Sequence, residues 1–372
     1  MNYDVIVVGG GLAGCSSAIH LADRGLQVLV LEQQKFPSHK LCGEFLSIEV
    51  IDSFTRLGVL DRVNQIGAHK IDRAVVTSPS GGRFEHNLPG TALGISRYQL
   101  DHILWQHAQT VGATCCDGTI VGDITGDLDQ GFSVKTAKQE FRGKVVLGAY
   151  GKRSGLDRKL QRQFIRQDSP WIAYKTHAYG LSIPNTIELH GFDGGYCGLS
   201  MIETGEVNLC WIGHKKIIKS APDRNFPPAL FANLALADRL NQLHFNPGVK
   251  CNLGQICFAI KGNFVGDICM IGDTAGMITP FCGDGMAMAL RSAEIAVPLV
   301  IKYLEHNLTK SQFKYQYQQK WRQEFSFRLK LGRWLHQAFS QPLLANLSIN
   351  TCRQFPPIGN WLIAKTRGNR AS

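Results

Sequence analysis

The first 32 residues of the chain follow a fixed order of strand, glycine-rich turn, helix and second strand. An apolar, β-branched run over residues 4–8 indicates a buried strand, and it leads into a G-x-G-x-x-G pattern between Gly9 and Gly14. Apolar residues at helical spacing follow over residues 13–24, and a second apolar run ends at Glu32. This order predicts two parallel strands joined by a helix, which restricts the chain to an α/β core.

Each residue type in this stretch suits the binding of an adenine dinucleotide. Gly9 permits a tight turn, Gly11 lets a pyrophosphate approach bare backbone, and Gly14 lets the helix pack closely on the strand. The N-terminus of the helix offers unpaired N–H groups and the positive end of its dipole to the phosphates. Glu32, eighteen residues after Gly14 (32 − 14), is placed to accept hydrogen bonds from ribose hydroxyls. The stretch alone leaves FAD and NAD both open.

Composition describes an ordinary globular protein of two domains. The chain has 372 residues, of which 44% are hydrophobic and 19% charged. Its 11 cysteines are scattered without metal-ligand spacing, so we expect no metal site. No apolar run approaches the ~18–20 residues of a membrane span. The odd cysteine count and a start that enters a strand at once predict a cytoplasmic protein.

Positive charge gathers at the end of the chain. The formal net charge is +11, and much of the excess lies between Lys302 and Arg370, where Trp321, Phe325, Phe327 and other bulky apolar residues interleave. The plain interpretation is a solvated cationic helical face with a docked apolar stripe. The alternative is a patch for an anionic membrane surface or an acidic carrier protein, which would make the protein peripheral at the membrane. No recognition motif accompanies the charge, so we expect no nucleic-acid partner.

Pattern changes along the chain predict three parts. Alternating strand and helix signals indicate a discontinuous nucleotide-binding domain, short strands indicate an inserted β-rich substrate domain, and the basic tail is helical to about residue 345. Ser47 and Ser96 have the position of N-caps before two amphipathic helices. The predicted boundaries are 1–72, 94–168 and 256–304 for the nucleotide-binding domain, 73–93 and 169–255 for the substrate domain, and 305–372 for the tail.

A second, distant set of residues indicates a flavin. Arg97 begins a helix, where it can face cofactor phosphates. A strand ends at Gly272-Asp273, so that Asp273 can bind a ribityl hydroxyl, which NAD lacks. The loop 280–285 then offers N–H groups and a helix dipole to the flavin ring, where charge develops on reduction.

These motifs resemble those of FAD-dependent oxidoreductases of the p-hydroxybenzoate hydroxylase fold, and within it the geranylgeranyl reductase-like branch. The resemblance covers about residues 1–300, and it includes the run 39–44, with its Cys-Gly pair, and the glycine–tyrosine strand around Tyr196. It implies a Rossmann-like FAD-binding domain with a β-rich substrate domain. It also implies a reductase or dehydrogenase that acts on a carbon–carbon bond of an apolar, isoprenoid, polyketide or carrier-bound substrate. FAD would be held non-covalently, with NAD(P)H as a possible electron donor.

The chain also departs from the patterns of related enzymes. Tyr150-Gly151 stands where hydroxylases of this fold usually have Asp-Gly, and Leu199-Ser200 replaces the Phe-Pro motif of prenyl reductases. The Trp-x-Trp-x-Ile-Pro signature of flavin halogenases is absent, which argues against halogenation. Two alternatives remain open: an aromatic monooxygenase that uses NAD(P)H and oxygen, and a non-catalytic flavin-binding module.

Four residues are candidates for a direct chemical role. Glu44 would act as proton donor or base if burial raises its pKa, with Cys42 beside it; otherwise Glu44 orders the loop by bonding to backbone. Tyr196 is a proton donor or substrate contact, or else a packed strand aromatic. Cys282, near a helix N-terminus, would have a lowered thiol pKa, or else it fills a tight loop.

The residues expected to hold FAD come from both sets of motifs. They are Gly9, Gly11, Leu12, Ala13, Gly14, Glu32, Gln33, Lys40, Cys42, Gly43, Arg97, Gly151, Gly272, Asp273, Pro280, Gly283, Asp284, Gly285 and Met286.

Overall fold

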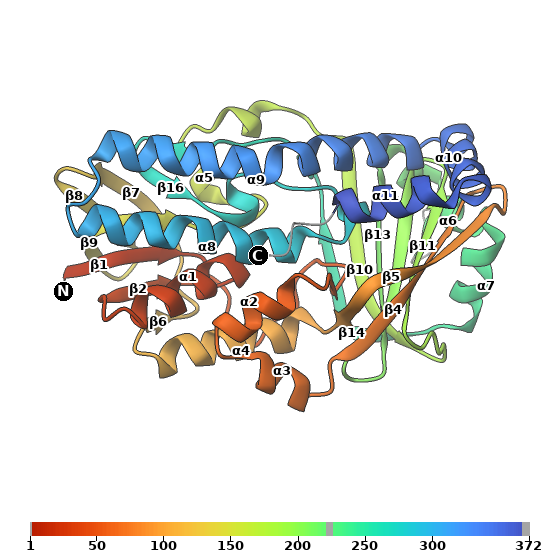
Figure 1. Cartoon of the computed structure of the whole chain (residues 1–372), viewed down its shortest axis with the longest axis horizontal. Coiled ribbons are helices and arrows are strands. Elements are labelled where there is room, and N and C mark those ends of the chain that lie inside the picture. The colour runs from red at the N-terminus through yellow and green to blue at the C-terminus, as the bar shows by residue number, and fades with distance from the viewer. Residues whose placement is uncertain (1, 221–225, 367–372) are drawn as a thin grey trace.

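Two eight-stranded sheets form the framework of the protein. In Figure 1, strands of the first sheet such as β1 and β2 lie at the left, and strands of the second such as β4 and β5 lie at the right. The computed structural model describes residues 2–220 and 226–366. The first sheet contains the predicted βαβ unit, since β1 pairs in parallel with both β2 and β9. Its path is β15-β16-β9-β1-β2-β6, and β7 and β8 extend it from β9. The strands are β1 (Asn2–Val8), β2 (Val28–Leu31), β6 (Thr114–Cys116), β7 (Val121–Asp127), β8 (Gly131–Thr136), β9 (Glu140–Gly148), β15 (Phe264–Val265) and β16 (Ile268–Met270).

Three helices pack together beside this sheet. The helix α1 (Leu12–Ala22) contacts both α4 (Arg97–Thr110) and α8 (Gly285–Leu304). All but one of the residues of α1 are buried, because the helix lies between its neighbours and the sheet. The predicted cap of α4 is confirmed, since the Gln99 N–H donates to the side chain of Ser96 over 3.2 Å. The N-termini of α1 and α4 therefore have fixed positions relative to β1.

The second sheet is mainly antiparallel and follows the order β14-β10-β13-β12-β11-β4-β5-β3. Only the pair β4 and β11 is parallel among the pairings that the described residues make in it. Its strands are β3 (Phe45–Leu46), β4 (His69–Thr77), β5 (Arg83–Gly94), β10 (Trp171–Tyr179), β11 (Thr186–Phe192), β12 (Gly195–Met201), β13 (Val207–His214) and β14 (His244–Leu253). Among the shorter helices, α5 (Gly155–Lys159) connects the first sheet to the second. The others lie between strands of the second sheet: α2 (Val50–Arg56), α3 (Leu60–Gln65), α6 (Pro228–Phe231) and α7 (Leu234–Gln242).

The α/β fold class predicted from the sequence is confirmed. The domain boundaries themselves stay a prediction. One local expectation is wrong, because Ser47 is not the cap of α2, whose N-cap is Glu49. The strand β14 had no counterpart among the elements expected from the sequence. Ser47 instead donates its hydroxyl proton to the Glu49 carboxylate over 3.2 Å.

The C-terminal region is helical well beyond residue 345. The helix α9 (Lys310–Phe339) has 30 residues, about 45 Å at 1.5 Å per residue, and it runs along both halves of the molecule in Figure 1. It is followed by α10 (Pro342–Gln354) and α11 (Pro356–Thr366). Pro342 and Pro356 begin helices rather than end them, because the first turn of a helix does not need their missing N–H. Within the described ranges, no helix combines the length and the apolar character that crossing a membrane requires.

The buried face of α9 joins it to both sheets. Trp321 and Phe325 are buried near the first sheet, whereas Phe327 and Trp334 of the same helix are about half exposed. Near its end, His336 is buried against the rings of Trp171 and Phe258. Neither ring nitrogen of His336 has a hydrogen-bond partner among the described residues. Burial therefore lowers the pKa of His336 to about 4.

This histidine predicts a loss of stability in mild acid. In the unfolded chain its pKa returns to about 6.5, so below that pH the unfolded state binds a proton that the folded state resists. The free energy of unfolding should fall by on the order of 3 kcal/mol as the pH drops from about 6.5 to about 4. In denaturant titrations across this pH range, the free energy of unfolding of His336→Phe should change less with pH than that of the wild type. The exposed His244 provides the control variant His244→Gln, which should keep the wild-type slope. If His336→Phe showed the same change of unfolding free energy with pH as the wild type, His336 would not be the source of the acid sensitivity.

Candidate active site

The turn between β1 and α1 accepts glycine alone at two positions. A Cβ on Gly9, whose φ is +112°, would lie 2.3 Å from the Ala149 carbonyl oxygen, and one on Gly14 would lie 1.8 Å from the Gly9 carbonyl oxygen. Gly11 is different, because the nearest atom to its absent Cβ is Nη2 of Arg97, 3.7 Å away. Gly11 is also the N-cap of α1 and has no side-chain cap, so the N-terminal N–H groups face open space beside a guanidinium. This arrangement suits a pyrophosphate.

A network of charged side chains lies next to this turn. Glu32 accepts the Gly10 N–H over 2.7 Å and the Gln34 N–H over 2.9 Å, one on each carboxylate oxygen. Each oxygen keeps a second lone pair, which leaves Glu32 able to accept ribose hydroxyls. Lys40 Nζ lies 3.8 Å from Glu32 and 3.2 Å from the fully buried Asp101. Gln33 is exposed and lies outside this network.

Asp101 holds Arg97 in place, and sequence reasoning missed it. Arg97 donates to its two carboxylate oxygens over 2.6 and 2.8 Å. Burial alone would raise the pKa of Asp101, but Arg97 and Lys40 hold it below its ordinary value. The i, i+4 spacing of Arg97 and Asp101 on one helix face was a signal that could have revealed the pair.

The distant motif lies against the same turn. Gly272, with φ of +58°, has its absent Cβ 2.9 Å from Ala13, and its N–H donates to Ser292 of α8 over 2.8 Å. A short 3₁₀ turn, Pro280–Cys282, leads to Gly283, whose φ is +71° and whose Cβ would lie 2.8 Å from the Phe45 ring. The two glycine loops, more than 250 residues apart, thus border one space (272 − 14 = 258 at their nearest).

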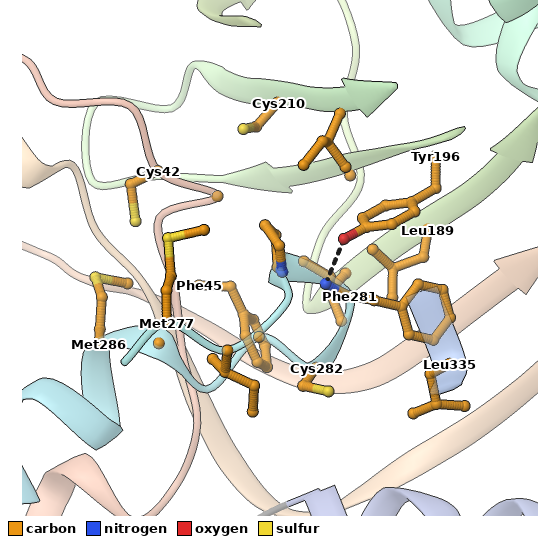
Figure 2. Close-up of a pocket in the computed structure, with 18 of the residues that line it drawn as sticks. Cys42, Phe45, Leu189, Tyr196, Cys210, Met277, Phe281, Cys282, Met286 and Leu335 are labelled. Carbon is orange, nitrogen blue, oxygen red and sulfur yellow. Dashed lines mark hydrogen bonds between the residues drawn. The ribbon is translucent and has the colours of Figure 1, made fainter. Parts of the chain in front are cut away.

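That space is a cavity of about 530 Å³, which extends from the glycine loops to the second sheet. Figure 2 shows Cys42, Met277 and Met286 at one side of it and Tyr196 and Phe281 at the other. Of the residues predicted for the site, those that line the cavity are Gly11, Leu12, Ala13, Cys42, Gly43, Glu44, Arg97, Gly151, Tyr196, Gly272, Asp273, Pro280, Cys282, Gly283, Gly285 and Met286. Those outside its lining are Gly9, Gly14, Glu32, Gln33, Lys40 and Asp284.

Asp284 does not face the cavity. It is fully buried, and one carboxylate oxygen lies 3.5 Å from Nη2 of Arg328 on α9. The left-handed turn at Gly283 directs the chain so that the backbone of Gly283 and Gly285, and not the Asp284 side chain, borders the space. A direct contact between Asp284 and the cofactor stays a prediction.

Glu44 is a fully buried charge at the wall of the cavity. It has φ of +53° and no exposed surface, and Lys175 Nζ lies 2.5 Å from one oxygen while His177 Nε2 lies 2.7 Å from the other. The Arg97 N–H also donates to it, over 2.7 Å. Burial alone would raise the pKa of Glu44, but Lys175 and His177 hold it below its ordinary value. The condition under which Glu44 would donate a proton, a raised pKa, is not met.

Sequence reasoning missed Lys175 and His177. Both come from β10, where residues two apart share a face of the sheet. A lysine and a histidine at that spacing, in a strand whose other residues are apolar or aromatic apart from Thr176, were a signal for a buried acid nearby. The acid itself, from a loop more than 100 residues earlier, could not be paired with them from sequence alone (175 − 44 = 131).

The other three chemical candidates differ in character. Cys42 is partly exposed and lines the cavity. Tyr196 is buried, and its hydroxyl oxygen accepts the Phe281 N–H over 2.8 Å, the dashed line in Figure 2. Burial raises the pKa of Tyr196 well above its ordinary value, so the phenol stays protonated. Burial, with the Asp284 carboxylate nearby, also raises the pKa of the Cys282 thiol to about 12, so the expected lowering is wrong.

Comparison with known proteins identifies the family. Residues 2–305 match the model of the FAD binding domain. The chain belongs to this FAD-binding family. It is 26% identical over 347 residues to digeranylgeranylglycerophospholipid reductase 2 of Methanothermobacter thermautotrophicus, covering 89% of this chain and 86% of that one. It is 27% identical over 318 residues to a menaquinone reductase of Mycobacterium tuberculosis, covering 80% and 76%. The protein is an FAD-dependent oxidoreductase.

Solved structures share the fold of this flavoprotein. A flavin-dependent brominase superposes with a TM-score of 0.82 at 19% identity, covering 98% of this chain and 93% of the other. A probable FAD-dependent monooxygenase from Pseudomonas aeruginosa gives a TM-score of 0.74 at 17% identity, covering 94% and 99%. The p-hydroxybenzoate hydroxylase-like fold is therefore confirmed. The open backbone at Gly11, the adjacent guanidinium and the carboxylate of Asp273 in the cavity fit FAD as the cofactor.

The position of Asp273 predicts its part in FAD retention. Asp273→Ala should raise the Kd for FAD about 10- to 100-fold, since hydrogen bonds to an ionised group contribute about 1.5–3 kcal/mol each. Fluorescence titration of FAD into the apoprotein measures this. The exposed Asp52 on α2 supplies the control, and Asp52→Ala should leave the Kd unchanged. An unchanged Kd for FAD in Asp273→Ala would show that Asp273 does not bind the ribityl chain.

The buried Glu44–Lys175 pair predicts a specific pattern of stabilities. Glu44→Gln should lower the free energy of unfolding by about 3–5 kcal/mol, because it leaves a buried ammonium without its carboxylate. Adding Lys175→Met should restore most of the loss, because the unpaired charge is removed. The exposed Glu85, which pairs with Arg83, provides the control Glu85→Gln, with an expected change below about 1 kcal/mol.

The free energies of unfolding are measured in denaturant for the wild type, Glu44→Gln, the double variant with Lys175→Met, and Glu85→Gln. Equal stability of the single and double variants would show that the Lys175 charge is not what destabilises Glu44→Gln.

Proposed function

We propose that the protein is a reductase or dehydrogenase that adds hydrogen to, or removes it from, a carbon–carbon bond of an apolar, isoprenoid-like substrate. The observation that carries the proposal is the cavity beside the two glycine loops. Its wall on the side of the second sheet consists mainly of aliphatic and aromatic side chains, among them Val76, Leu189, Trp211 and Ile212. Such a wall binds a substrate by burial of apolar surface.

The names of the relatives also support a redox reaction on an isoprenoid-like substrate. Two of them, from an archaeon and from a bacterium, carry reductase names, and the substrates in those names are a digeranylgeranyl lipid and menaquinone. Both names describe molecules with long isoprenoid portions. The brominase and the monooxygenase share the fold at identities below 20%, so their reactions carry no weight for this chain.

Two side chains are candidates to handle the proton. Reduction of a carbon–carbon double bond needs a hydride, which reduced FAD supplies when bound, and a proton. The Tyr196 phenol accepts from Phe281, and no hydrogen bond within the described residues uses its own proton. Tyr196 therefore has a proton to donate toward a substrate. The Cys42 thiol, at the opposite side of the cavity, is the second candidate.

Glu44 has a different role in this proposal. Because Lys175 and His177 lower its pKa, it stays ionised and serves as a positioning residue. It connects the loop that carries Cys42 to β10 and to the N-terminus of α4. In this way the carboxylate holds Cys42 and Gly43 at the cavity wall without exchanging a proton with substrate.

A single-turnover experiment without oxygen tests the function. The FAD-loaded protein is reduced with dithionite under nitrogen and mixed with detergent-dispersed menaquinone or an unsaturated geranylgeranyl lipid. We expect the absorbance of oxidised flavin to return and the product to carry two additional hydrogen atoms by mass spectrometry. NAD(P)H is then tried in place of dithionite as the electron donor.

The alternatives give different results in the same experiment. Reoxidation only after air is admitted, with an oxygen atom in the product, would identify a monooxygenase. Flavin that no donor reduces would identify a non-catalytic binding module. Tyr196→Phe, which removes one hydroxyl, should slow the anaerobic reaction about 100-fold or more while FAD remains bound, if this phenol is the proton donor.

A further inference from the structure

The last two helices expose an unusual amount of apolar surface. Leu343 is 84% exposed, Leu347 64%, Phe355 58% and Trp361 50%. All four belong to α10, α11 or the residue between them, and the two helices pack against each other and against β5. Helices that dock fully on a core bury their large apolar residues, so a group of exposed ones marks an interaction surface. We name this group, with Trp334 of α9 and Leu344 and Ile358, the apolar face.

The apolar face surrounds one end of the cavity. Leu347, Ile358 and Trp334 line the cavity and are also exposed, at 64%, 43% and 53%. The same cavity reaches Gly11, Asp273 and the loop 280–285 at its other end. A molecule bound beside the glycine loops therefore has a continuous apolar route to the surface between α9, α10 and α11. The exit of this route lies within the apolar face.

The charged residues of the segment that carries the apolar face have one sign. No aspartate or glutamate follows Glu324 in the sequence, whereas Arg328, Lys330, Arg333, Arg353, Lys365, Arg367 and Arg370 do. Arg328 is buried against Glu49 and Asp284, but Lys330, Arg353 and Lys365 are exposed. Cationic side chains beside exposed leucine, phenylalanine and tryptophan are the composition of helices that lie in an anionic membrane interface.

We propose that α10 and α11 dock on the surface of an anionic lipid bilayer, so that the cavity opens toward the lipid and takes its apolar substrate from there. The docking itself depends on the apolar face and its positive charge; only the identity of what enters the cavity rests on the function proposed above. A bilayer suits this surface better than an acidic carrier protein does. The exposed residues are mostly leucine and aromatic side chains that gain by leaving water, and the cavity exit lies among them rather than among the cations.

Vesicle sedimentation of the full-length, FAD-loaded protein tests the docking. The probes are phosphatidylcholine vesicles with and without phosphatidylglycerol. We expect strong binding to the phosphatidylglycerol-containing vesicles and at least tenfold weaker binding to phosphatidylcholine alone. The triple variant Leu343→Ser, Phe355→Ser, Trp361→Ser leaves the cavity lining and the charge unchanged and should lose binding at least tenfold.

A matched control uses an apolar residue exposed elsewhere. Ile120→Ser removes a side chain that is 66% exposed directly before β7 of the first sheet, and it should bind vesicles like the wild type. The charge variant Arg353→Gln with Lys365→Gln should reduce the preference for phosphatidylglycerol. FAD content and melting temperature, unchanged in all variants, show that they are folded.

Several outcomes would overturn the proposal. They are a wild type that sediments with neither vesicle, a triple variant that binds like the wild type, and a wild type that binds a purified acyl carrier protein but no vesicle. The proposed function is read out separately, with detergent-dispersed substrate. Vesicle binding without turnover would leave the docking intact and reject the function, whereas turnover without vesicle binding would do the reverse. If both hold, the triple variant should lose turnover only on substrate embedded in vesicles.

Discussion

The buried carboxylate of Glu44 is the interaction that connects the cofactor half of the molecule to the substrate half. It comes from the loop after β2, and its partners are Lys175 and His177 on the second sheet and the first N–H of α4 on the other side. None of these groups could be buried alone, because an unpaired charge in the interior costs several kcal/mol. The two sheets and the loop must therefore come together as a set, and the cavity forms where they meet.

The remaining parts of the site depend on that meeting. The turn after β1 borders the cavity at Gly11, and the loop before α8 borders it at Gly283 and Gly285, so that both present backbone to it. The second sheet and α9 supply the apolar wall. The candidates for a chemical or positioning role are the Tyr196 phenol, the Cys42 thiol and the ionised Glu44 carboxylate, which its partners hold in place. In such a site the protein contributes position, polarity and a proton, while the electron transfer belongs to the flavin.

Local chemistry made the cofactor half predictable from sequence. At positions 9 and 14 the close approach of backbone leaves room for glycine alone. The Ser96 cap and the strand end before Gly272-Asp273 are also set by neighbouring residues, and the structure contains both. The sequence could not show which way a side chain in these loops points. Asp284 lies in a correctly identified loop but faces Arg328 of α9, a helix that begins 26 residues later (310 − 284). The pKa of Cys282 and Glu44 likewise depends on burial and on partners from distant segments, which no local pattern encodes.

The residues that line the cavity come from both the beginning and the end of the chain. The lining of the cavity begins at Gly11, in the turn expected to bind the dinucleotide, whereas α10 and α11, which complete the opposite end, are the last described helices. During synthesis the nucleotide site can therefore form before the substrate chamber is closed. A chain shortened after α9 would keep both glycine loops and lose one side of the chamber. Substitutions in the last helices can consequently alter which molecules fit without touching the residues that grip the cofactor, so substrate range and cofactor use can diverge independently in this architecture.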